Sequence, residues 1–83
     1  MANIANILLG QLGKLLGDAE VSLYKLLKKS GKDNITVDEY TIRIGHSEST
    51  NQIKAVFVNE VPVLKADINI VLNALEALEN SLE

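Results

Sequence analysis

Residues 64–82 read LKADINIVLNALEALENSL, and this stretch carries the clearest helical pattern in the chain. Its apolar residues step by four, three, four, three and four positions, which is the a/d spacing of a coiled-coil seam. We predict a helix that begins at about Lys65 or Asp67. The apolar seam needs cover from the same chain or from another chain, and the spacing leaves both alternatives open. The seam residues are Leu64, Ile68, Val71, Leu75, Leu78 and Leu82.

A second amphipathic pattern occupies the other end of the chain. Placed at 100° per residue, nine apolar residues fall on one arc, which keeps its phase for about seven turns. They are Ile4, Leu8, Leu12, Leu15, Leu16, Ala19, Leu23, Leu26 and Leu27. This coherence favours one long helix from about Asn3 to Lys29, closed by lysines at its negative end and by Gly31 just beyond it. The competing interpretation breaks the helix at Gly17–Asp18, where Asp18 would cap a second helix.

Residues 35–44 have the composition of a β-strand, with β-branched and aromatic residues at alternate positions. The apolar parity changes between Val37 and Tyr40, so the two ends of one continuous strand would face opposite sides. We therefore expect a β-bulge at Asp38–Glu39.

A polar, turn-rich segment, residues 45–52, joins this strand to a second one at residues 53–58. A third strand at residues 61–64 is a weaker prediction. Glutamate is poorly suited to the positive φ that a type I′ turn at Asn59–Glu60 requires, and Pro62 is acceptable only in an edge strand. An extended segment outside the sheet is the alternative.

These elements predict a single α+β domain over residues 1–83. It has a long N-terminal amphipathic helix, a two- or three-stranded antiparallel β-sheet and a C-terminal helix with heptad-like apolar spacing. Both faces of the strand at residues 53–58 are apolar, so helices on one side of the sheet cannot cover it alone.

Size and composition exclude several classes of protein. A chain of 83 residues buries only about 60–65% of the surface that its unfolded form exposes, so its core needs support. The chain has no cysteine and one histidine, so we expect neither a disulfide nor a metal site. Its net charge of −3 argues against nucleic acid as a partner. We expect no transmembrane segment and no secretory signal peptide, which places the protein in the cytoplasm or within a larger particle.

The concentrated polar stretch, Gly45 to Asn51, contains His46, hydroxyl groups and a carboxylate. Gly45-His46-Ser47-Glu48 resembles the start of a hydrolase nucleophile elbow, but Ser49 stands where that motif needs glycine. We interpret the stretch as a solvated loop and predict no catalytic residue, no cofactor and no enzyme activity.

Three glycines within the N-terminal helix are unusual, because each costs about 1 kcal/mol relative to alanine in a helix interior. They lie within roughly 60° of one another, away from the leucine stripe. A bare helix side lets another backbone approach, whereas the alternative is that the glycines mark a helix break. On the first interpretation, the predicted interface combines the C-terminal seam with Leu8, Gly10, Leu12, Gly13 and Gly17.

Charge is distributed unevenly: residues 1–32 sum to +3 and residues 33–83 to −6. The acidic residues at the end of the last helix oppose its macrodipole, which disfavours negative charge there. A lysine cluster could relieve them within one molecule if the two helices run parallel, or in another copy if they run antiparallel. The predicted complementary groups are Lys25, Lys28 and Lys29 against Glu76, Glu79 and Glu83.

The sequence thus favours a non-enzymatic structural subunit that self-associates or docks into a larger protein assembly through its apolar helices, a viral or phage particle being one example. One alternative is an amphipathic membrane-surface protein that uses residues 1–17, although that segment has a single lysine and no tryptophan. Another is a small regulatory nucleic-acid-binding protein that uses the lysines between Lys25 and Lys32.

Overall fold

The computed structural model describes the backbone of residues 2–82 and the side chains of residues 13–82. The first element is a single helix, α1 (Ala2–Ser30), of 29 residues. The prediction of one long helix is therefore confirmed. The helix passes through Gly17–Asp18 without a break, because its buried stripe keeps one phase across that position.

Helix α1 ends in a Schellman motif. The N–H of Gly31 donates to the carbonyl oxygen of Lys28 at 3.1 Å, and the N–H of Lys32 donates to that of Leu27 at 3.3 Å. Gly31 has a φ of 77°, a conformation in which a side chain would be strained. Lys28 and Lys29 lie in the last turn, where the helix dipole favours positive charge.

Four antiparallel strands follow, in the spatial order β1-β2-β3-β4. The count exceeds the expected two or three because the bulge predicted at Asp38–Glu39 was wrong. Val37 pairs with Tyr40, so Asp38 and Glu39 form a two-residue hairpin turn, with Asp38 at a φ of 51°. Paired residues face the same side of a sheet, so the hairpin turn places the side chains of Val37 and Tyr40 on one face despite the change in apolar parity between them. The strands are β1 (Asn34–Val37), β2 (Tyr40–Ser47), β3 (Gln52–Val58) and β4 (Val61–Pro62).

The turn between β3 and β4 adopts the conformation that glutamate disfavours. Asn59 and Glu60 have φ values of 52° and 69°. Asn59 compensates by two hydrogen bonds with the backbone of Thr41, at 2.9 Å through its side chain and 2.8 Å through its N–H. The carboxylate of Glu60 pairs with the guanidinium of Arg43. The third predicted strand is thus formed over Val61–Pro62 only, since Val63 and Leu64 belong to a 3₁₀ helix, and Pro62 lies in the edge strand, where it interrupts no ladder.

A short 3₁₀ helix, η1 (Val63–Lys65), connects the sheet to α2 (Ile68–Leu82). Asp67 caps α2: its side-chain Oδ1 accepts the N–H of Asn69 at 2.8 Å, and its carbonyl accepts the N–H of Val71 at 3.0 Å. Leu64 therefore lies in η1 and not in the C-terminal helix, which corrects the first member of the predicted seam.

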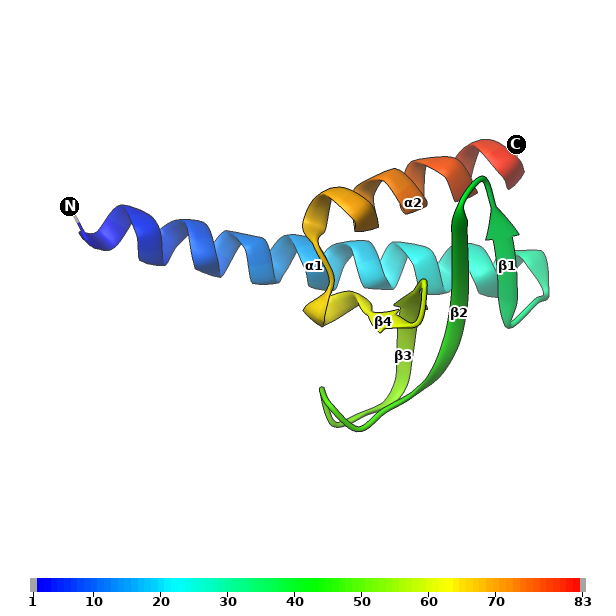
Figure 1. Ribbon diagram of the computed structural model, residues 1–83, viewed down its shortest axis with the longest axis horizontal. Coiled ribbons are helices and arrows are strands. Elements are labelled where there is room, and N and C mark those ends of the chain that lie inside the picture. The colour runs from blue at the N-terminus through cyan, green and yellow to red at the C-terminus, as the bar shows by residue number, and fades with distance from the viewer. Residues whose placement is uncertain (1, 83) are drawn as a thin grey trace.

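The two helices lie side by side, run in the same direction and cover one face of the sheet (Figure 1). Of the two helix arrangements left open by the sequence, the parallel one is present. One core joins α1, α2, η1 and the inner face of the sheet. Its most deeply buried members include Leu23, Leu27, Ile42, Val56, Val58, Val63, Val71 and Leu78.

The outer face of the sheet has its own cover. The guanidinium carbon of Arg43 lies 4.0 Å from the centroid of the Phe57 ring, and Phe57 is buried. Gly45, two residues along β2, leaves room for this arrangement, because a Cβ there would collide with the Arg43 guanidinium. The stacked Arg43 guanidinium thus covers Phe57, which the helices on the other side of the sheet cannot cover.

Candidate functional site

The C-terminal seam faces the interior of its own chain. Val71 and Leu78 are fully buried, and Leu75 and Leu82 pack against the same core. Ile68 is half-buried at the start of α2. Of the alternatives left open by the sequence, the structure places the seam within one molecule, where its buried leucines offer no surface to a partner.

The apolar stripe of α1 is covered over only part of its length. Ala19, Leu23 and Leu27 are buried and Leu16 packs against them, but Leu15 is 49% exposed. Helix α2 has 15 residues against the 29 of α1. The backbone of the N-terminal half of α1 therefore extends past α2 and the sheet (Figure 1). In the sequence the stripe continues through this half as Ile4, Leu8 and Leu12, whose side chains lie outside the described residues.

The glycine side of α1 is open where the structure describes it. A Cβ at Gly13 or Gly17 would meet no atom within 4 Å, whereas Gly10 lies outside the described side chains. Neither Gly13 nor Gly17 is therefore needed for packing within this chain. Their helix-propensity cost of about 1 kcal/mol each has no compensating contact inside the molecule.

The predicted charge complement is not formed as ion pairs. Parallel helices bring the C-terminal ends of α1 and α2 to the same side of the molecule (Figure 1). Among the side chains of residues 13–82, however, the one ion pair is Arg43–Glu60. The Lys28 ammonium instead lies 5.5 Å from the centroid of the Tyr24 ring. The remaining members, Lys25, Lys29, Glu76 and Glu79, are exposed, and Glu83 lies outside the described residues.

An apolar groove that sequence reasoning missed runs between α1 and β3. It encloses about 270 Å³, and Val21, Tyr24 and Val56 form its apolar walls. Lys25 and Lys54 flank it. Val21 is 53% exposed and lies off the leucine stripe, which was a signal that the helix has a second apolar side.

Glu20 fixes the geometry of this groove. Its carboxylate accepts the N–H of Val56 at 3.1 Å and the side-chain amide of Gln52 at 3.0 Å, so both of its oxygens are used. Gln52 in turn accepts the hydroxyl of Thr50 at 2.8 Å. The bonds tie the middle of α1 to β3 on the side of the strand that faces away from β2.

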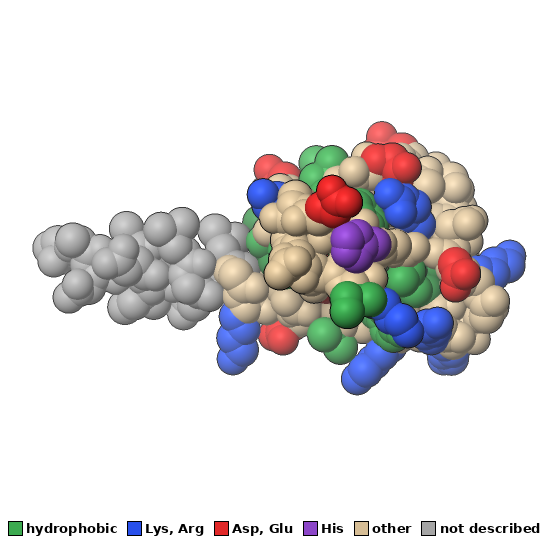
Figure 2. Space-filling model, turned by 90° about the horizontal axis from the view of Figure 1, so that it is seen from below, with side chains coloured by type: hydrophobic (Ala, Val, Ile, Leu, Met, Phe, Trp, Pro, Cys, Tyr) green, Lys and Arg blue, Asp and Glu red, His purple; other side chains and the backbone are tan. Residues whose placement is uncertain are grey.

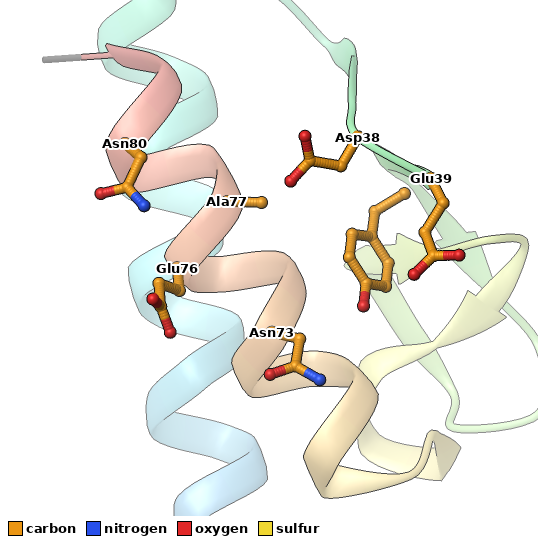
Figure 3. A pocket seen from close by; sticks show the side chains of 7 residues that line it. Asp38, Glu39, Asn73, Glu76, Ala77 and Asn80 are labelled. Atoms are coloured by element: carbon orange, nitrogen blue, oxygen red, sulfur yellow. The ribbon is translucent and has the colours of Figure 1, made fainter.

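A polar depression opens between the β1–β2 turn and α2 (Figure 3). Asp38 and Glu39 approach from the turn, whereas Asn73, Glu76 and Asn80 stand on α2. Its volume is about 260 Å³. In the part of the chain that the structure describes, no three His, Cys, Asp or Glu side chains are grouped to hold one metal ion.

The loop that contains His46 forms hydrogen bonds within itself. The hydroxyl of Ser47 lies 3.2 Å from that of Ser49 and accepts the N–H of Thr50 at 3.3 Å. His46 stands exposed on the surface, beside an acidic side chain and near hydrophobic and basic ones (Figure 2). The Ser47 hydroxyl thus bonds to its own loop, while the imidazole faces solvent.

Comparison with protein-family models, with curated proteins and with solved structures found no match to this chain. Across the residues that the structure describes, no helix has the length and apolar character that crossing a bilayer requires. The functional argument therefore depends on the two surfaces of α1 described above.

Proposed function

We propose that this chain is a non-enzymatic assembly subunit that associates with a second copy of itself through the N-terminal half of α1. The observation that supports the proposal is the extension of α1 beyond α2 and the sheet, with its apolar stripe continuing in the sequence (Figure 1). Most helical stability in proteins comes from tertiary packing of an amphipathic face, so this half would gain stability by packing against another surface.

The chemistry of the segment favours a second copy as that surface. Residues 2–17 carry one charged side chain, Lys14, so two such segments meet with little repulsion. The open sides of Gly13 and Gly17 lie away from the stripe, where they leave room for a further backbone. A two-fold axis would place the same stripe against itself, as in most homodimers. This contact closes at the dimer, so a larger particle, a virion or phage particle among them, would need a second contact between dimers.

Sedimentation equilibrium of the full chain tests this proposal. We expect a mass above the 9.0 kDa of one chain, and we expect Leu15→Lys and Leu12→Lys each to lower it. Ile70→Lys is the matched control, because Ile70 is 44% exposed and lies on α2 rather than on α1. A wild-type chain that sediments at 9.0 kDa throughout the micromolar range would overturn the proposal.

Vesicle co-sedimentation at low salt tests the alternative occupant of this segment. Self-association predicts that the chain stays in the supernatant with vesicles of phosphatidylcholine and phosphatidylglycerol. Pelleting with the vesicles that Leu12→Lys abolishes would instead assign the segment to a membrane surface and contradict the proposal.

A further inference from the structure

The groove between α1 and β3 combines an apolar floor with a net positive charge, because two lysines and one glutamate line it. Val21, Tyr24 and Val56 line it, and Lys25 and Lys54 flank it. Glu20, the acidic residue of the lining, already accepts hydrogen bonds with both oxygens. For comparison, an apolar cavity of roughly 150 Å³ holds a benzene ring. At about 270 Å³, the groove has room for a branched aliphatic side chain.

A complementary surface lies on α2 of the same chain. Leu72, Glu76 and Glu79 are spaced by four and three residues, so they share one side of the helix. Leu72 is 43% exposed, and both glutamates are exposed. The last turn of α2 has no basic residue, so nothing within that turn offsets the two carboxylates. An apolar side chain followed by two negative charges is the chemical inverse of the groove.

The groove cannot receive this surface within one molecule. Two residues of helix rotate a side chain by roughly 200°, and four residues rotate it by roughly 40°. Val21 and Lys25 therefore share one side of α1, and Leu23 and Leu27 share the opposite side. Leu23 and Leu27 are buried in the core that α2 helps to form. The groove side of α1 therefore faces away from α2.

We propose that the groove binds α2 of a second copy, with Leu72 between Val21 and Tyr24 and the glutamates beside the two lysines. Both halves of the contact occur on every chain, and each matches the other in charge and in polarity. This inference does not depend on the N-terminal half of α1. Because the two surfaces differ, the contact is head-to-tail and adds copies into a ring or a filament.

Charge reversal in the full chain tests the contact. All chains carry Leu15→Lys, so that pairing through the extended half of α1 does not contribute. We expect Lys25→Glu with Lys54→Glu to weaken association by about tenfold or more, because like charges then face each other. Glu76→Lys with Glu79→Lys should weaken it equally. Mixing the two reversed chains should restore assembly, since each reversed surface then meets its complement.

Sedimentation velocity at low and high salt gives the readout. The control chain carries Glu48→Lys with Lys65→Glu, which preserves net charge at exposed positions outside both surfaces. It should assemble like its parent, and added salt should weaken assembly of both by screening. Failure of the mixture to associate, or equal association of the singly reversed chains and the control, would overturn the proposal.

Cysteine crosslinking supplies a second measurement that does not depend on charge. The natural sequence contains no cysteine, so Val21→Cys with Leu72→Cys introduces the sole thiols. Oxidation should produce a ladder of disulfide-linked dimers, trimers and longer chains on a denaturing gel. Val21→Cys with Ile70→Cys is the matched control and should remain largely monomeric. Equal ladders from both variants would contradict the head-to-tail contact.

Discussion

Replacing Glu20 tests how α1 is attached to the sheet. Its carboxylate accepts the N–H of Val56 at 3.1 Å and the amide of Gln52 at 3.0 Å. Val56 is fully buried, so Glu20→Ala leaves its N–H without this acceptor. The Gln52 amide is also released from α1. The substitution thus removes two hydrogen bonds to one ionised group without deleting a core side chain.

The expected loss follows from these two bonds. A hydrogen bond to a charged group contributes about 1.5–3 kcal/mol net, and partial exposure of this pair lowers its value, so we expect a total loss of about 2–3 kcal/mol. At about 0.05–0.15 kcal/mol per residue, that is a large fraction of the stability of so small a domain. Glu20→Gln retains one acceptor oxygen and should lose about half as much.

Urea unfolding followed by circular dichroism measures the effect. With a slope of about 1 kcal/mol per molar urea, Glu20→Ala should lower the midpoint by about 2–3 M. Two protein concentrations are needed, because self-association would add to the apparent stability. Asp18→Ala is the matched control on the same helix, since Asp18 is exposed, and it should change stability by less than about 0.5 kcal/mol.

A midpoint for Glu20→Ala that matches the Asp18→Ala control would refute this reasoning. It would mean that water satisfies the Val56 N–H as well as the carboxylate does, and that α1 is held to β3 by apolar contacts alone. The groove beside Glu20 would then lack the fixed wall that our head-to-tail contact uses.

Three further substitutions test the core, the outer face and the glycine side. Leu78→Ala should lower the free energy of unfolding by about 2–5 kcal/mol, because Leu78 is fully buried in this chain. A loss of association without a loss of stability would instead place the seam between chains. Gly45→Ala should displace Arg43 from the Phe57 ring and cost about 1 kcal/mol in chemical denaturation, and an unchanged midpoint would show that the guanidinium moves freely. Gly17→Ala should raise the melting temperature, since alanine is about 1 kcal/mol more favourable than glycine in a helix and the added Cβ meets no atom. A lower sedimentation mass in the same variant would indicate close backbone approach between copies.

Much of the fold was predictable because the apolar periodicity of each helix persists over several turns. The stripe of α1 keeps its phase across Gly17, so the helix continues there despite the cost of glycine. The seam of α2 predicted its helix in the same way, and Asp67 set its first residue through a cap. Local chemistry near Gly31 was sufficient to end α1.

The sheet was less predictable, because different backbone paths produce the same side-chain parity. A bulge within one strand and a two-residue turn between two strands both reconcile Val37 with Tyr40, and only long-range pairing distinguishes them. The positive φ of Glu60 was likewise unfavourable locally. The ion pair with Arg43, a residue seventeen positions away in the chain, offsets the cost of this conformation.

The sequence by itself determined the two helices, the absence of cysteine, the uneven charge and the two apolar stripes, because these are properties of residue type and spacing. Tertiary structure decided which parts of the two apolar stripes are buried in the core of the chain. Packing turned the α2 seam inward, buried Ala19, Leu23 and Leu27 of α1 and set Val21 beside Val56 to form a groove. Those outcomes depend on contacts between segments that lie far apart in the chain. The periodicity of one segment does not specify which other segment packs against it.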